Sequence, residues 1–108
     1  MSDLLVIQVA VPDEAVGLAI AQALIEKRLV ACAQIVPGTT SVYRWNGQIE
    51  RSREALLLLK THADRYGEVD GTVKSLHPYE TPEIIATPVV RYSEEYAAWI
   101  VDSVQARA

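Results

Sequence analysis

Residues 39–61 of this chain read TTSVYRWNGQIERSREALLLLKT, and the topology of the whole sheet follows from this segment. The dipeptide Asn46-Gly47 at its centre suits a type I′ turn, because both central positions of that turn need a positive φ. The turn predicts a long hairpin whose distal half is more polar than its base. In this register residues on the same face of the hairpin pair across the turn, namely Trp45 with Gln48 and Tyr43 with Glu50.

The segment before this hairpin predicts a strand, a helix and a further strand. Residues 4–11 form a nearly unbroken apolar run, which is typical of a strand buried on both faces. Pro12 suits the first position of a helix that ends near Arg28. A strand over residues 30–45 follows, in which Pro37-Gly38 predicts a bulge. Four residues recur at helical spacing and predict the buried face of the helix: Leu18, Ala21, Ile25 and Leu29.

The segment after the hairpin predicts a second helix, a strand and a terminal helix. Residues 63–76 show helical spacing, and Pro78 prevents the helix from continuing. Residues 83–91 predict the last strand, where Pro88 is tolerated only at an edge or a bulge. Ser93 suits the N-cap of the final helix, and its buried face is predicted to contain Tyr96, Trp99 and Ile100.

This element order predicts an α+β fold of the ferredoxin-like type, βαββαβ, with a long hairpin between the second and third strands and a C-terminal helix. A length of 108 residues, half of them hydrophobic, suits one domain over residues 1–108. The expected strand order is 4-1-3-2. Both central strands are apolar at successive positions, yet two crossover helices cover only one face of the sheet. The terminal helix covers part of the other face, so we expect a homo-oligomer.

Composition and charge exclude several classes of protein. A net charge of -4 with 22% charged residues is not that of a disordered tail or of a polybasic nucleic-acid binder. The single cysteine, Cys32, allows no intrachain disulfide, and the N-terminus lacks a cationic start and a long apolar run, so we expect no membrane span and a cytoplasmic location. The glycines form neither a P-loop nor a dinucleotide fingerprint. No acid-base pair is specified, so we do not expect an enzyme.

The sequence His77-Pro78-Tyr79-Glu80 contains the strongest candidate metal ligands. Pro78 favours a turn, and in a turn the His77 imidazole and the Glu80 carboxylate could meet one ion. Imidazole nitrogen suits copper or zinc, and Cys32 would add a soft ligand if folding brought it near. The alternative is structural, because the same residues also suit the exit from a helix and the start of the following strand.

Further residues suit a ligand pocket or a contact between subunits. Lys60 closes the apolar third strand, where its ammonium could meet an anion or extend into water. Aromatic residues are favoured at interfaces, so the aromatic and acidic residues of the hairpin are expected to contact a neighbouring subunit or a ligand. Cys32 lies among small residues and suits a buried thiol, and His62 suits a solvated surface position. The predicted pocket set is Lys60, Tyr43, Trp45, Glu50 and Tyr79.

Four stretches of the sequence resemble the CutA family of divalent-cation tolerance proteins over nearly the whole chain. They are LVACA at residues 29–33, VPGTTSVYRW at 36–45 with GQIE at 47–50, LLKT at 58–61, and LHPYETPEIIA at 76–86. The resemblance implies a ferredoxin-like subunit in a homotrimer similar in architecture to the PII signalling proteins, with long hairpins contributing to intersubunit sheets. It also implies a role in divalent-ion tolerance, with Cu²⁺ or another divalent cation as the bound metal.

The same resemblance makes His77 the best metal candidate. Val9 and Leu76 stand where some members have a cysteine and a second histidine, so Glu80, Cys32 or symmetry-related chains would have to complete a copper site. The alternative function is a PII-like sensor or protein-interaction trimer, in which clefts between subunits bind a small anion through Lys60 and His77.

Overall fold

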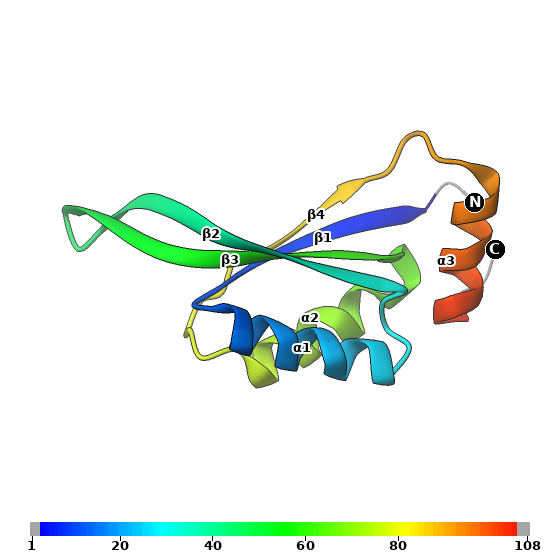
Figure 1. Cartoon of the computed structure of the whole chain (residues 1–108), viewed down its shortest axis with the longest axis horizontal. Coiled ribbons are helices and arrows are strands. Elements are labelled where there is room, and N and C mark those ends of the chain that lie inside the picture. Colours follow the sequence, from blue (N-terminus) through cyan, green and yellow to red (C-terminus); the bar gives the residue numbers. More distant parts are fainter. Residues whose placement is uncertain (1–2, 106–108) are drawn as a thin grey trace.

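The computed structural model describes residues 3–105, and the ends of the predicted domain, residues 1–2 and 106–108, lie outside the described residues. The predicted α+β order is confirmed (Figure 1). The elements are β1 (Leu4–Val11), α1 (Glu14–Glu26), β2 (Cys32–Trp45), β3 (Gln48–His62), the short 3₁₀ turn η1 (Ala63–Arg65), α2 (Tyr66–Leu76), β4 (Ile84–Pro88) and α3 (Glu94–Val104).

The four strands form one antiparallel sheet in the order β2-β3-β1-β4, which is the predicted order. The two edge strands contain Pro37 and Pro88, as expected for a residue that cannot donate a ladder hydrogen bond. The predicted hairpin register is also confirmed, with Trp45 opposite Gln48. A register shift between Val36 and Thr39 is the predicted bulge. The distal half of the hairpin extends beyond the rest of the sheet (Figure 1).

Helix α1 begins later and faces the sheet differently from the prediction. The helix starts after Asp13 instead of at Pro12. Asp13 is the N-cap, because its carboxylate accepts a hydrogen bond from the Val16 amide at 2.9 Å. The predicted face is wrong at two positions, since Leu18 and Ile25 are exposed. Gly17 explains the rotation, because a Cβ there would lie 3.2 Å from side-chain atoms of the sheet. Close contact at this glycine turns its own face of the helix toward the sheet, so the residues three, four and seven positions further on are buried with it: Ile20, Ala21 and Leu24.

The main core lies between the sheet and the layer formed by α1 and α2, which cover the same face of the sheet (Figure 1). Side chains alternate along a strand, so the odd-numbered residues of β1 and β3 face these helices. Burial of the large aliphatic side chains there supplies most of the stabilisation, at roughly 1.5–3 kcal/mol for each. The fully buried members include Ile7, Val9, Leu57, Leu59, Ile20, Leu24, Val69 and Val73.

The opposite face of the sheet is covered only at one end by the described residues. Helix α3, capped by Ser93 as predicted, packs Ala97 and Ile100 against Leu4 at the end away from the hairpin tip (Figure 1). We call the remainder the open face. Its members follow from the strand pairing: Cys32, Gln34 and Val36 of β2, Leu56, Leu58 and Lys60 of β3, Val6 and Gln8 of β1, and Ile85 and Thr87 of β4.

Two predictions at the C-terminal end are wrong in part. Strand β4 ends at Pro88 instead of residue 91, because beyond Pro88 the chain leaves the sheet toward α3. Ile100 is buried as predicted, but Tyr96 and Trp99 remain 43% and 47% exposed. Their rings stack on each other with centroids 5.6 Å apart. The buried face of α3 is formed instead by small and aliphatic residues, because these fit closely against Leu4.

Candidate functional site

His77 ends α2 and is held by hydrogen bonds on both ring nitrogens. Its backbone is extended at the C-cap, where Pro78 prevents a further helical turn. The Nε2 atom lies 2.7 Å from the carbonyl oxygen of Ala10, and Nδ1 accepts a hydrogen bond from the Tyr79 amide at 3.1 Å. The side chain is buried, at 7% exposure. A metal ion would have to displace one of these two hydrogen bonds before it could reach the imidazole.

Tyr79 connects the same turn to the hairpin. Its hydroxyl donates to a carboxylate oxygen of Glu54 at 2.9 Å, and its ring lies 4.7 Å from the His77 ring, centroid to centroid. Burial, followed by the hydrogen bond to Glu54, raises the pKa of Tyr79 to about 12. The phenol therefore stays protonated and donates to Glu54, which is itself buried at the base of the polar half of the hairpin.

The hairpin residues of the predicted pocket separate into two groups. The Tyr43 hydroxyl pairs with the Ser52 hydroxyl at 2.6 Å, and the charge of Tyr43 contributes to the raised pKa of Tyr79. Tyr43 and Tyr79 thus belong to one neighbourhood. Trp45 lies nearer the hairpin tip, and Glu50 is directly opposite Tyr43; both side chains are exposed, with Trp45 at 63%. The side chains at the tip are therefore available for contact with another molecule.

Cys32 and Lys60 form a second neighbourhood, on the open face. They are directly paired across β2 and β3, and the Lys60 ammonium donates a hydrogen bond to the side-chain oxygen of Gln34. Cys32 is partly exposed, so the prediction of a buried thiol is wrong. It lies beside Tyr96 of α3, and burial, with the neighbouring Cys32 as a further cause, raises the pKa of that phenol. The thiol of Cys32, between the small residues Ala31 and Ala33, therefore lies at the surface of the sheet.

The two neighbourhoods are well separated along β1. Lys60 pairs with Val6, whereas His77 contacts the carbonyl of Ala10 four positions further on. At about 3.3 Å per residue these positions are about 13 Å apart. One ion therefore cannot contact both Cys32 and His77 of the same chain.

The predicted metal residues do not fit a dedicated site within one chain. Glu80 is exposed beside the His77 turn. Across residues 3–105 no group of three or more histidine, cysteine and acidic side chains lies close enough to hold a metal ion. Dedicated sites usually have three or four converging ligands. Within residues 3–105, His77, Glu80 and Cys32 therefore do not converge on one point.

Three residues of these neighbourhoods are not predicted from the residue pattern alone, namely Glu54, Ser52 and Gln34. The predicted solvated position of His62 is wrong. The hairpin register contained a signal for Ser52, which lies two residues after Glu50 and so shares its face. His62 is buried, not solvated, because its Nδ1 accepts a hydrogen bond from the Asp64 amide and caps η1. Within the described part of the chain, no helix has the length and apolar character needed to span a membrane.

Known proteins of the CutA family are similar to this chain over most of its length. The sequence profile described as CutA1 divalent ion tolerance protein matches residues 5–103. A divalent-cation tolerance protein CutA from Thermus thermophilus is 46% identical over 95 residues, which cover 88% of this chain and 92% of that protein. Protein CutA of Mus musculus is 41% identical over 92 residues, 85% of this chain but only 52% of the mouse protein.

The fold agrees with the same family. The crystal structure of CutA from Xylella fastidiosa superposes with a TM-score of 0.93 at 38% identity, covering 95% of this chain and 99% of that one. The profile match spans most of the chain, and the bacterial relative exceeds 30% identity along almost its full length. The chain is therefore a member of the CutA1 divalent ion tolerance family.

Proposed function

We propose that this chain acts in divalent-cation tolerance as a homotrimer without enzymatic activity, assembled through the open face of its sheet. The observation that supports the proposal is the character of that face. Its centre is aliphatic, with Leu56 and Leu58 on β3 and Val6 on β1, and only one end is covered by α3 within the described residues. Contiguous apolar surface of this kind is typical of sites that contact another protein.

The exposed side chains at the margins of the open face also favour association. Ile85 on β4 and Val36 on β2 are 52% and 41% exposed, although both sit on a strand that packs on the core. Edge strands β2 and β4 present unpaired backbone groups beside them, which a neighbouring strand would satisfy. An assembly with closed symmetry would cover the face and the edges together.

For the metal, we propose that Cu²⁺ or another divalent cation contacts Cys32 from several copies of the chain, with Glu80 as a second candidate donor. A thiolate is a soft ligand that suits Zn²⁺, and it suits copper in the reduced Cu(I) form. Cys32 is partly exposed on the open face, so association through that face would bring equivalent thiols nearer to one another. His77 is the weaker candidate, because both of its ring nitrogens already have hydrogen-bond partners. The reducing cytoplasm suits the free thiol.

Copper titration of metal-free protein tests this assignment. Cys32→Ser should weaken copper binding at least tenfold, whereas His77→Gln, which keeps a donor and an acceptor, should bind like the unchanged protein. Lys74→Ala is a matched surface control remote from the thiol. Equal copper affinity in Cys32→Ser and the unchanged chain would remove Cys32 from the proposal.

The sensor alternative has less structural support. It requires a small anion to touch Lys60 and His77, which lie at positions about 13 Å apart along β1 in one chain. Only a cleft between copies could combine them. A thermal-shift screen of nucleotides and small anions would favour the sensor if one of them stabilised the protein and Lys60→Ala abolished the effect.

A further inference from the structure

Arg28 holds a backbone conformation that is unfavourable for its residue type. After α1 ends, the Leu29 amide donates to the Leu24 carbonyl at 2.9 Å, and the Arg28 amide donates to the Ile25 carbonyl at 3.0 Å. This pattern places Arg28 in the left-handed region, with φ 57°. Glycine is the usual residue there, because a Cβ is strained in this conformation. Strained residues of this kind concentrate at functional sites.

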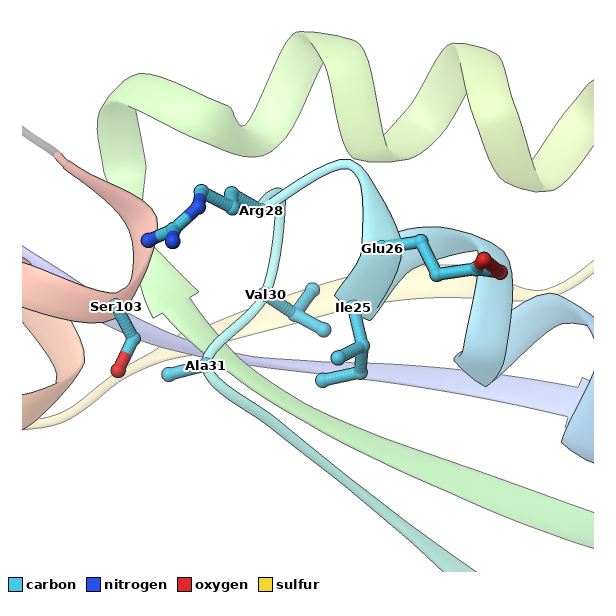
Figure 2. Close-up of a pocket in the computed structure, with 6 residues that line it drawn as sticks. All are labelled: Ile25, Glu26, Arg28, Val30, Ala31 and Ser103. Atoms are coloured by element: carbon cyan, nitrogen blue, oxygen red, sulfur yellow. The ribbon is translucent and has the colours of Figure 1, made fainter.

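A pocket opens beside this residue, between the end of α1, the start of β2 and the last turn of α3. Its volume is about 380 Å³, within the range of small-molecule sites. Figure 2 shows the aliphatic side chains of Ile25 and Val30 side by side at the end of α1, with the Arg28 guanidinium extending toward α3, which contains Ser103. The lining residues are Ile25, Glu26, Arg28, Val30, Ala31 and Ser103.

The Arg28 guanidinium has no structural task among residues 3–105. The C-terminal carbonyls of α3 are already capped by Arg65, whose Nε and Nη2 donate to the Val104 oxygen at 2.9 and 2.7 Å. The carbonyls at the end of α1 accept from backbone amides. No ion pair or side-chain hydrogen bond of Arg28 occurs in this part of the chain. Its five donors are therefore available to a ligand.

We propose that this pocket binds a small organic monocarboxylate with an aliphatic body. A guanidinium matches a carboxylate through two parallel hydrogen bonds. Ser103 lines the same pocket, with its hydroxyl directed away from the guanidinium (Figure 2). Ile25 and Val30 provide an apolar wall for the body of the ligand. Glu26 on the rim disfavours ligands with several negative charges. The inference is independent of the proposed metal role, because none of the metal candidates lines this pocket.

Isothermal titration with a series of straight-chain carboxylates, from acetate to hexanoate, tests the proposal on the full chain. The affinity should rise by about fourfold for each methylene that enters the pocket. Arg28→Gly should abolish the binding, and Arg28→Lys should weaken it, because an ammonium cannot form the paired hydrogen bonds. Lys27→Ala, which removes a neighbouring positive charge outside the pocket, should leave the affinity unchanged.

Arg28→Gly should also change the stability of the fold. The direction of this change distinguishes a loss of carboxylate binding from a loss of folding. Glycine adopts the left-handed conformation without strain, so the midpoint of thermal unfolding should rise by several degrees while carboxylate binding is lost. Amide shifts in nuclear magnetic resonance spectra should place the bound carboxylate at Ile25, Val30 and Ser103. The proposal is overturned if no carboxylate of the series binds, if Arg28→Gly binds them as well as the unchanged chain does, or if the shifts map elsewhere.

Discussion

The Nε2 atom of His77 lies 2.7 Å from the carbonyl oxygen of Ala10 and ties the end of α2 to the end of β1. A carbonyl oxygen only accepts, so Nε2 carries the hydrogen and donates it. Nδ1 then accepts from the Tyr79 amide. The imidazole therefore acts as a neutral connector between the helix layer, the sheet and the loop that leads to β4.

Replacing this connector should destabilise the fold. His77→Ala leaves the buried carbonyl of Ala10 and the amide of Tyr79 without their partner, which should lower the free energy of unfolding by about 2–3 kcal/mol. His77→Gln, which can donate and accept, should recover part of that loss. Urea unfolding at one fixed protein concentration measures both variants. Equal stability of His77→Ala and the unchanged chain would show that the imidazole has no structural role.

Tyr79 should make stability depend on pH in the alkaline range. Its pKa is raised to about 12 in the folded chain, first by burial and then by Glu54, against 10.0 ordinarily. The neutral phenol is thus favoured by folding, so its contribution is complete below pH 10 and is lost as the pH rises through 12. Tyr79→Phe should cost about 1 kcal/mol at neutral pH, a low value because the side chain is partly exposed.

The informative quantity for Tyr79 is the difference in unfolding free energy between the unchanged chain and Tyr79→Phe. This difference should be constant up to pH 10 and shrink between pH 10 and 12. Tyr66→Phe, at the start of α2, serves as a control for the general titration of tyrosines. A difference that stays the same across this range would contradict the role given to the Glu54 hydrogen bond.

The N-cap of α1 provides a third test. The Asp13 carboxylate accepts from the Val16 amide at 2.9 Å, so Asp13→Ala should destabilise the protein by about 1 kcal/mol. Asp13→Ser keeps an oxygen that can cap and should lose much less. Thermal unfolding of the two variants compares them directly. A Pro12 variant that lowered stability more than Asp13→Ala would instead favour the helix start predicted from the sequence.

Local signals in the sequence predicted the sheet well. Asn46-Gly47 determined the hairpin register, because its turn type allows few alternatives, and Pro37 and Pro88 identified the edge strands. The apolar character of both central strands also indicated a second face that the crossover helices leave open. The structural alternative for His77, a helix exit that fixes the next strand, is the arrangement found.

The orientation of the helices and the contacts of the candidate site were not predicted, because they depend on tertiary contacts that the spacing of residues in the sequence does not encode. The inward face of α1 was predicted wrongly because the close approach of Gly17 to the sheet sets the helix rotation. The distance between Cys32 and His77 depends on strand order and register together. Glu54 was missed because its partner Tyr79 is 25 residues away in sequence. Tyr96 and Trp99 were expected inside, although their aromatic character is equally typical of interfaces.

A charge on the open face should prevent association. Leu58 lies near the centre of that face, and an aspartate there would be buried without a partner in the assembly. Leu58→Asp should therefore shift the protein toward monomers that keep their secondary structure by circular dichroism. Leu18→Asp is a matched control, because Leu18 is 58% exposed on the solvent side of α1. Equal association of both variants would exclude the open face as the contact.

Sedimentation equilibrium of the unchanged protein tests the central claim, association through the open face, most directly. The chain has a mass of 11.9 kDa, so a homotrimer should sediment as a single species of three times that mass at micromolar concentration. A stable species of 11.9 kDa over the same concentrations would contradict it.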